Sequence, residues 1–258
     1  MANKLNIIYT FSMESKTSSM DKETSSMDKE TSSIVLPELD LEKSINWIAQ
    51  SKTCFIPSNN YKYQNDTKCE GPVIQSNWVI PQHLLCGGYL NTDKEVSLLR
   101  DAGITKFVCL NYEYGKNSYL YYRYADKLPT SDFIHIPIHD MSITEKHIVS
   151  KMCIVIADMI LAGETVYVHC SGGHGRTGTF IALILNILYP QLHIDQVFDY
   201  IQYAHDHRIG NYFGPQYFAR YLKSDNKNDN EFADKFAIGQ VPTPQTLEQR
   251  KQVISLWK

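Results

Sequence analysis

The sequence has no long hydrophobic run and no large excess of either charge. Its longest apolar stretch, residues 180–189, is interrupted by Asn186 and is about half as long as the roughly 20 residues that a bilayer-crossing helix needs. The 25 Lys and Arg residues nearly balance the 28 Asp and Glu residues, which gives a formal net charge of −3. We therefore expect no membrane span, and no binding to nucleic acid or an anionic membrane through overall charge.

Paired metal-binding or redox cysteines are also missing. None of the six cysteines forms a Cys-x-x-Cys pair, which excludes a zinc knuckle and a thioredoxin-type motif. The apolar residues 5–11 are followed by no convincing cleavage region, so we expect no signal peptide. Reduced thiols are then favoured over disulfides, and we expect a cytoplasmic protein. The cysteines are Cys54, Cys69, Cys86, Cys109, Cys153 and Cys170.

A repeated segment near the N-terminus is poor in residues that could build a core. Residues 13–33 hold three similar heptads, of which the last two are identical copies of Met-Asp-Lys-Glu-Thr-Ser-Ser. One Met in each heptad cannot form a buried stripe, so we interpret residues 1–33 as a disordered tail. A segment regulated by phosphorylation of its serines is the alternative. Residues 34–77 are expected to form an irregular extension, and residues 78–258 a globular domain.

Strand-like and helix-like patterns alternate along the globular part. We expect strands at residues 83–90, 105–110, 133–138 and 165–169, and helices at residues 92–102, 144–162, 178–188, 194–204 and 245–257. Thr92 and Glu95 have the spacing of a capping box at the start of the first helix. This alternation predicts an α/β fold with a central mixed sheet of about four to five strands flanked by helices.

The segment at residues 166–179 carries the most specific chemistry. It predicts a strand that leads into Cys170, a loop rich in glycine, and a helix that Arg176 opens. Glycines at positions 172, 173 and 175 let successive backbone N–H groups point into one concavity, to which the helix N-terminus adds the positive end of its dipole. Arg176 adds a planar fork that grips two oxygens of a phosphate. The loop is therefore a candidate site for a tetrahedral dianion.

Cys170 lies at the floor of this predicted cradle. The same positive field stabilises a thiolate, and a thiolate beneath a bound phosphoryl group is a nucleophile aimed at phosphorus. Thr177 is placed to donate a hydrogen bond to the sulfur. Residues 173–178 also spell the Gly-x-Gly-x-x-Gly dinucleotide fingerprint, but the segment after Pro190 has a helical pattern where that fold needs a second parallel strand. A purely structural glycine turn would leave Arg176 unexplained.

The pattern His169-Cys170-x5-Arg176-Thr177 resembles the signature of cysteine-dependent protein-tyrosine and dual-specificity phosphatases. The resemblance implies a protein-tyrosine-phosphatase-like fold and a cysteinyl-phosphate intermediate on Cys170. It also implies that no metal or other cofactor is needed. By the same resemblance, the phosphate is bound by Ser171, Gly172, Gly173, His174, Gly175 and Arg176.

The second marker of this family is an aspartate on a loop upstream of the cysteine. Ile136-Pro137-Ile138-His139-Asp140-Met141 fits this marker, because a strand runs into a loop there, 30 residues before Cys170. By resemblance, Asp140 is the general acid that protonates the leaving oxygen and then the base that activates water. An ordinary turn residue is the alternative for Asp140. Asp132 is the spare candidate, although it precedes the strand.

A third marker is Pro244-Gln245-Thr246-x-x-Gln249, which resembles the Gln-Thr-x-x-Gln loop of the larger tyrosine phosphatases. By resemblance, Gln245 positions the hydrolytic water and Gln249 assists it, and an exposed helix start is the alternative. Together the resemblances cover residues 78–222 and 243–257, so residues 78–258 are expected to form a phosphatase domain.

The resemblance implies a phosphoprotein as substrate and partner, with phosphotyrosine as the first target and phosphoserine and phosphothreonine as the wider range. An RNA 5′-phosphatase or a phosphoinositide phosphatase with the same chemistry is one alternative. Both favour a more basic rim, and lipid phosphatases of this superfamily often have Lys at the position of His174. A catalytically silent phosphate-binding module is the other alternative. Residues 112–124, rich in Tyr, are a candidate aromatic lip, and Cys109 is a candidate redox partner of Cys170.

Overall fold

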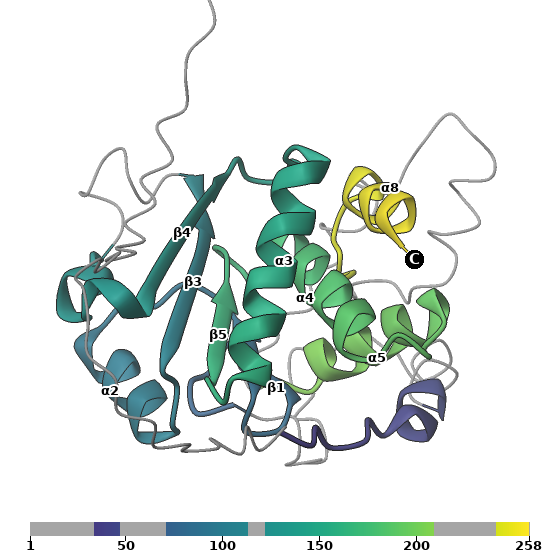
Figure 1. Ribbon diagram of the computed structural model, residues 1–258. Helices are drawn as coiled ribbons and strands as arrows, with labels where there is room; N and C mark the ends of the chain where they lie inside the picture. Colours follow the sequence, from purple (N-terminus) through teal and green to yellow (C-terminus); the bar gives the residue numbers. More distant parts are fainter. Residues whose placement is uncertain (1–33, 47–70, 113–121, 209–240, 258) are drawn as a thin grey trace, which may run out of the picture. The chain divides into compact units, whose positions relative to one another are not determined.

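The computed structural model describes residues 34–46, 71–112, 122–208 and 241–257, and its central element is a five-stranded mixed sheet (Figure 1). The strand order is β1-β2-β5-β3-β4. β1 runs antiparallel to β2, and the other neighbouring pairs are parallel. The strands are β1 (Ser76–Ile80), β2 (Leu84–Gly87), β3 (Lys106–Asn111), β4 (Phe133–Ile138) and β5 (Val166–His169).

Helices cover both faces of the sheet. α3, α4, α5 and α8 pack on one face, and α2 packs on the other (Figure 1). The predicted α/β fold, with a mixed sheet of four to five strands flanked by helices, is confirmed. The helices are α2 (Asp93–Asp101), α3 (Lys146–Leu161), α4 (Gly175–Leu188), α5 (Ile194–Asp206) and α8 (Leu247–Leu256), with 3-10 turns η2 (Tyr124–Lys127) and η3 (Thr130–Asp132).

The prediction that residues 34–77 are irregular is wrong in two places. Residues 41–46 are helical, and β1 begins at Ser76. β1 is absent from the predicted strands because it opens with polar residues, although Ser76 and Asn77 are both buried. The extension is also part of the packed fold, since the hydroxyl of Tyr189 donates to the carbonyl of Pro37 at 2.8 Å. The tail predicted at residues 1–33 lies outside the described residues.

Most helices begin and end close to the predicted residues. The capping box of α2 is present, with the hydroxyl of Thr92 accepting from the backbone N–H of Glu95 and the Glu95 carboxylate accepting from the backbone N–H of Thr92. Gly103 and Gly163 follow α2 and α3 with φ of +90° and +95°, as helix-ending glycines do. α4 begins at Gly175, three residues before the predicted start at 178.

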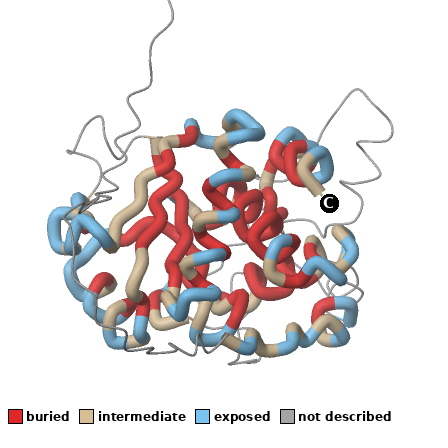
Figure 2. Tube along the Cα trace, in the orientation of Figure 1, coloured by how far each residue is buried: buried red, intermediate tan, exposed pale blue. Residues whose placement is uncertain are grey.

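Alternation of side chains along the strands builds two cores, one on each face of the sheet. Val166 and Val168 of β5 belong to the larger core with α3, α4, α5 and α8, and Tyr167 between them belongs to the smaller core with α2. α4 and every strand except β4 are buried over most of their length, whereas most residues of β4 are only partly buried (Figure 2). In α4 every residue from Gly175 to Asn186 is buried, so packing holds this helix, and with it the loop that precedes it, on all sides. No helix within the described ranges is both long and apolar enough to cross a membrane.

The carboxyl ends of β4 and β5 lie at the same edge of the sheet, because both strands run parallel to β3 between them. In open α/β sheets this edge is where ligands bind. Cys170 follows β5 directly, and Asp140 lies in the loop that follows β4. The topology therefore brings together two loops that are distant in the sequence.

His169, the last residue of β5, is fully buried and makes two hydrogen bonds. Its Nδ1 faces the carbonyl oxygen of Cys170 at 3.2 Å and so carries the ring proton. Its Nε2 then accepts a short hydrogen bond from the hydroxyl of Tyr124, which is itself fully buried. This pair fixes the end of β5 directly before Cys170.

Tyr124→Phe leaves the buried Nε2 of His169 without its donor. We expect the variant to lose about 1–3 kcal/mol in the free energy of unfolding, measured by urea denaturation. Tyr122→Phe is the matched control, because the hydroxyl of Tyr122 bonds Asp93 at the surface, and we expect a change within about 0.5 kcal/mol. Equal losses in the two variants would contradict the role of Tyr124.

The stability of the fold depends on pH through four imidazoles, of which His169 and His205 are buried and His135 and His174 are partly buried. Burial lowers the pKa of His169 to about 4, and burial is also the main cause that lowers the pKa of His135, His174 and His205. The folded state keeps these rings neutral, whereas the unfolded chain protonates them near pH ~6.5. Below that pH the unfolded state binds more protons, so acid favours unfolding.

We therefore expect the free energy of unfolding to fall as the pH is lowered from about 6.5 toward 4, with about 3 kcal/mol of the loss due to His169. Urea denaturation at a series of pH values measures this. Between pH ~7 and 8 these groups predict no change. A free energy that stays constant from pH ~7 to 5 would show that the imidazoles are not held neutral by the fold.

Candidate active site

Cys170 opens the loop that joins β5 to α4, which we call the Cys170 loop (residues 170–176). Cys170 is 3% exposed, so its thiol is recessed. Gly173 has a φ of +74°, and a Cβ at this position would lie 2.5 Å from the carbonyl of Gly87 at the end of β2. Glycine is required here, since only it adopts this conformation readily and allows so close an approach to the sheet.

Arg176 is buried at the first turn of α4 and joins the Cys170 loop to the loop after β4. It is 2% exposed. One guanidinium nitrogen, Nη1, donates to the carbonyl of Ile138 at 2.8 Å, and the other, Nη2, donates to Oδ1 of Asp140 at 2.7 Å. The structure thus brings together the arginine and the aspartate that the sequence singled out 36 residues apart.

Asp140 lies in a tight turn, and its carboxylate remains accessible to solvent. Its side chain is 65% exposed, and its Oδ1 also accepts from the backbone N–H of Met141 at 3.0 Å. Two glutamines of α8 hold the residues that follow. Gln249 donates to the carbonyl of Ser142 at 3.1 Å, and Gln252 donates to the carbonyl of Thr144. α8 therefore sets the position of this loop.

Asp132, the spare candidate for the acid, is at the wrong end of β4. It forms ion pairs with Arg100 at 2.7 Å and Lys106 at 3.1 Å. Burial raises the pKa of its carboxyl, but hydrogen bonds and charge from these two cations outweigh that effect and lower it. Asp132 is thus a structural anchor, and Asp140 is the carboxylate that reaches the Cys170 loop.

Thr177 follows Arg176 in α4, and its hydroxyl is buried. Within the described residues, this oxygen has no hydrogen-bond partner. Buried hydroxyls nearly always have one, so the group is available to a partner that the protein chain does not supply or to a deprotonated thiol nearby. Thr177 also lines a small cavity of about 10 Å³ behind the loop, together with Gly173, Cys86 and Thr243.

Gln249 rather than Gln245 makes the contacts that the structure shows. Its Oε1 accepts from the backbone N–H of Thr246 at 3.0 Å, and a Cβ on Gly175 would lie 2.5 Å from the same oxygen. Gln249 thus touches the Cys170 loop while it holds Ser142. Gln245 is half-buried in the segment before α8, and its role in positioning water stays a prediction.

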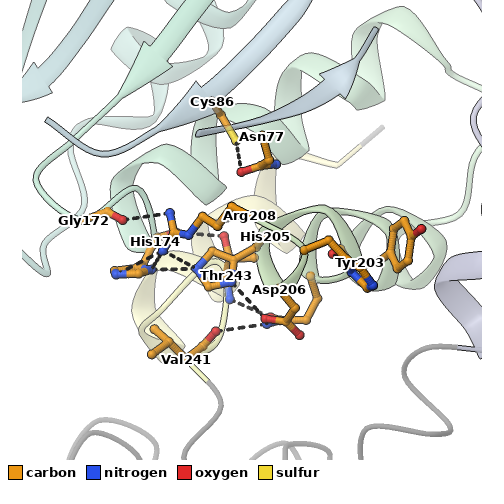
Figure 3. Close-up of polar contacts among 12 residues, drawn as sticks. Asn77, Cys86, Gly172, His174, Tyr203, His205, Asp206, Arg208, Val241 and Thr243 are labelled. Atoms are coloured by element: carbon orange, nitrogen blue, oxygen red, sulfur yellow. Dashed lines mark hydrogen bonds and ion pairs between the residues drawn. The ribbon is translucent and has the colours of Figure 1, made fainter. Parts of the chain in front are cut away.

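A buried polar network lies between the Cys170 loop and the end of α5 (Figure 3). Sequence reasoning named one member, His174, as a phosphate-loop residue and missed the rest. No local motif marks the missed residues. Three of them, Gln202, His205 and Asp206, have one signal, the helical spacing that places them on one side of α5, and the other two lie outside that helix. The missed residues are Gln202, His205, Asp206, Arg208 and Thr243.

The predicted aromatic lip is only partly supported. Tyr124 is fully buried against His169 and cannot belong to a lip. Tyr112 does lie at the rim, with its ring centroid 3.5 Å from that of His139, beside Asp140. Residues 113–121 of the candidate lip lie outside the described residues, and Tyr122 donates its hydroxyl to Asp93.

The described residues include buried cysteines but no cluster of metal ligands. Within the described residues, Cys86, Cys109, Cys153 and Cys170 are buried and form no disulfide. Cys109 belongs to the smaller core and Cys170 to the larger one, and burial raises the pKa of Cys109 to about 12. No group of three or more His, Cys, Asp or Glu side chains in the described ranges could hold a metal ion.

Comparison with known families gives a match over the region that holds this site. The family described as "Swiss Army Knife protein, DSP-PTPase phosphatase domain" matches residues 74–195. This range contains Asp140, Cys170 and Arg176. It ends at the start of α5, before His205 and Arg208.

Two viral proteins are similar to the chain, 067L of Invertebrate iridescent virus 3 and 197R of Invertebrate iridescent virus 6, each named "Putative tyrosine phosphatase". The first is 32% identical over 121 residues, which are 44% of this chain and 48% of the viral protein. The second is 31% identical over 109 residues, which are 40% of this chain and 39% of the viral protein. The matches thus span half or less of the length of these relatives.

Among solved structures, that of Tk-PTP in the active form is similar at 16% identity and a TM-score of 0.43, over 53% of this chain and 88% of that protein. The assignment to a family rests on the matched domain and the viral relatives. Residues 74–195 thus match a phosphatase domain of the dual-specificity and protein-tyrosine type, and they are similar to the two viral proteins.

Proposed function

We propose that the protein is a phosphatase that hydrolyses phosphotyrosine through a cysteinyl-phosphate on Cys170, without a metal ion. One observation carries this proposal. The buried guanidinium of Arg176, six residues after the recessed Cys170, binds the carboxylate of Asp140 at 2.7 Å. A nucleophile, an oxyanion-binding cation and a general acid therefore converge on one edge of the sheet.

The Arg176–Asp140 ion pair is the resting arrangement of this site. A phosphate dianion offers Arg176 a stronger bidentate partner than one carboxylate oxygen. In the proposed cycle, the substrate phosphate takes over Nη2 of Arg176, and Asp140 is released toward the leaving group. The exposed side chain of Asp140 can make this movement without unpacking the core.

In the first chemical step, the Cys170 thiolate attacks phosphorus, and an S–P bond forms as the P–O bond to the substrate breaks. Asp140, which takes up a proton from solvent as it leaves Arg176, gives this proton to the leaving oxygen. Arg176 and the backbone N–H groups of residues 171–176, contributed by Ser171, Gly172, Gly173, His174, Gly175 and Arg176, bind the equatorial oxygens where charge is stabilised. The unpartnered hydroxyl of Thr177 supports a role as hydrogen-bond donor to the sulfur.

In the second step, water attacks the cysteinyl-phosphate. Asp140, now a carboxylate, takes a proton from that water, the S–P bond breaks, and inorganic phosphate leaves. Gln245 is the proposed residue that orients the water, and Gln249 assists by holding the loop of Asp140 through Ser142.

Phosphotyrosine is the proposed substrate because an aromatic rim stands beside the acid. The adjacent, mutually tilted rings of Tyr112 and His139 offer a surface against which a substrate ring can pack. A phosphoprotein is thus the proposed partner. A thiolate nucleophile keeps its activity in a reducing compartment, so we propose a cytoplasmic location.

Cys170→Ser removes the nucleophile and keeps the shape of the loop. We expect no measurable hydrolysis of p-nitrophenyl phosphate or of a phosphotyrosine peptide in EDTA, while wild type turns over both. Calorimetry should show that the variant still binds inorganic phosphate, because Arg176 and the loop amides remain. Turnover by Cys170→Ser would contradict the mechanism, and activity lost in wild type on EDTA addition would contradict a metal-free site.

Asp140→Asn removes the acid and the carboxylate that competes for Arg176. We expect kcat on a phosphotyrosine peptide to fall by about 10²–10⁴-fold and phosphate to bind more tightly. Asp132→Asn is the matched control, because it breaks the ion pairs with Arg100 and Lys106 away from the site, and its kcat should stay within about twofold of wild type. Equal losses of kcat in both variants would show that Asp140 has no special role.

The class of substrate is determined by assaying the wild-type protein on different phosphate esters. Phosphotyrosine and phosphothreonine peptides of one sequence, a 5′-phosphorylated RNA and a phosphoinositide are compared by kcat/KM. A preference for the tyrosine peptide supports the proposal. A preference for the RNA or the lipid would replace the substrate while leaving the thiolate chemistry in place.

A further inference from the structure

The polar network at the end of α5 forms a closed ring of hydrogen bonds with the Cys170 loop. Starting from the loop, the carbonyl of Gly172 accepts from Nη1 of Arg208 at 3.0 Å. Nη2 of Arg208 lies 3.0 Å from Nε2 of His205, and Nδ1 of His205 lies 3.0 Å from Oδ1 of Asp206 (Figure 3). The chain of contacts thus runs from the loop into the end of α5.

The ring returns to the loop through the segment before α8. Gln202 donates from Nε2 to Oδ1 of Asp206 at 2.9 Å and accepts at Oε1 from the backbone N–H of Thr243 at 2.8 Å. The hydroxyl of Thr243 then donates to the carbonyl of His174 at 2.9 Å. Two carbonyls of the Cys170 loop are therefore held by two different segments that the network joins.

Every side chain of the ring that comes from outside the loop is buried. Gln202, His205, Asp206, Arg208 and Thr243 are between 0% and 4% exposed. Burial of a cation is unfavourable unless the cation is paired and hydrogen-bonded. Arg208 therefore depends on its hydrogen bonds with Gly172 and His205. Burial lowers the pKa of Arg208, and the nearby Cys86, Cys170 and Asp206 side chains raise it.

The protonation of His205 follows from its partners. Nδ1 faces the Asp206 carboxylate, so it carries the ring proton, and Nε2 is the acceptor. Burial and the charge of Arg208 lower the pKa of His205 well below its usual value, which keeps the ring neutral. The imidazole therefore stands between a buried cation and a buried anion and keeps the cation at the end nearest the loop.

Side chains of the same network lie against the glycines of the loop. A Cβ on Gly172 would lie 2.5 Å from the ring of His174, whose Nδ1 is 2.7 Å from Nε2 of His205 and 2.8 Å from Nη2 of Arg208. A Cβ on Gly173 would lie 2.8 Å from Nη1 of Arg208. The ring of His174 and the fork of Arg208 fill the space that side chains at these two positions would need.

We propose that Arg208 and His205 are positioning residues of the phosphatase site, which hold the Cys170 loop in its anion-binding form and place a positive charge beneath it. The proposal rests on the proposed function. Arg208 acts through the carbonyl of Gly172, which it pulls away from the concavity so that the loop N–H groups face the phosphate. Its charge also favours the thiolate of Cys170 and the bound dianion.

The test measures alkylation of Cys170 by iodoacetate as a function of pH, and protection of Cys170 by inorganic phosphate, with the modified peptide identified by mass spectrometry. Neither readout needs turnover. In Arg208→Met we expect the pH midpoint of alkylation to rise by about one unit and half-protection to need at least about tenfold more phosphate. With p-nitrophenyl phosphate, KM should rise and kcat should fall.

Arg208→Lys separates charge from geometry. Lysine keeps the positive charge but loses the planar fork that reaches both Gly172 and His205, so we expect the alkylation midpoint to return toward wild type while phosphate protection stays weak. His205→Gln should weaken phosphate protection about threefold to tenfold, because the link from Arg208 to Asp206 is cut. His207→Gln is its matched control, since Nδ1 of His207 bonds the carbonyl of Tyr203 on its own helix, and it should behave as wild type.

Wild-type alkylation and phosphate protection in a folded Arg208→Met variant would overturn the proposal. If that variant does not fold, wild-type values in both Arg208→Lys and His205→Gln would overturn it instead. The proposed function fails separately. If wild type hydrolyses no phosphate ester but phosphate protects Cys170 in the pattern above, the positioning role stands without the phosphatase activity. If phosphate does not protect wild type, both fail.

Discussion

The burial of the Arg176 guanidinium is the constraint on which the site depends. A buried cation needs partners to offset its loss of hydration. Those of Arg176 include the carbonyl of Ile138 at the end of β4 and the carboxylate of Asp140 just after it. Burying Arg176 therefore also fixes the place of Asp140. The same pairing holds the guanidinium that is proposed to bind phosphate against a carboxylate, so its position is set by the fold itself.

Residues 170–174 of the Cys170 loop form no helix or strand, and their shape comes from the elements that surround them. Gly173 lies against the end of β2, Gly175 lies against Gln249 of α8, and the carbonyl of Gly172 is bound by Arg208 after α5. Each support comes from a different element that packs on the sheet or on α4. A loop held on three sides loses little entropy when an anion binds, which is the physical basis of preorganised catalysis.

Local chemistry explains which parts of this arrangement could be predicted from sequence. The order of strands and helices, the glycines of the Cys170 loop and the capping box at Thr92 are encoded by neighbouring residues, and they were predicted. Asp140 was found by its distance from Cys170 in a pattern already recognised. β1 was missed because Ser76 and Asn77 are polar but buried by tertiary packing. Arg208, His205 and the contact of Gln249 were missed because only the fold brings them to the loop.

The imidazole between Asp206 and Arg208 has a consequence for the field in the site. If the carboxylate bound the guanidinium directly, the two charges would cancel at the distance of the loop. With the neutral ring of His205 between them, the pair becomes an extended dipole whose positive end touches Gly172 and whose negative end lies against Gln202. The loop amides, the N-terminus of α4, Arg176 and Arg208 then all present positive charge to one point. A dianion is the ligand that the proposed function assigns to this point.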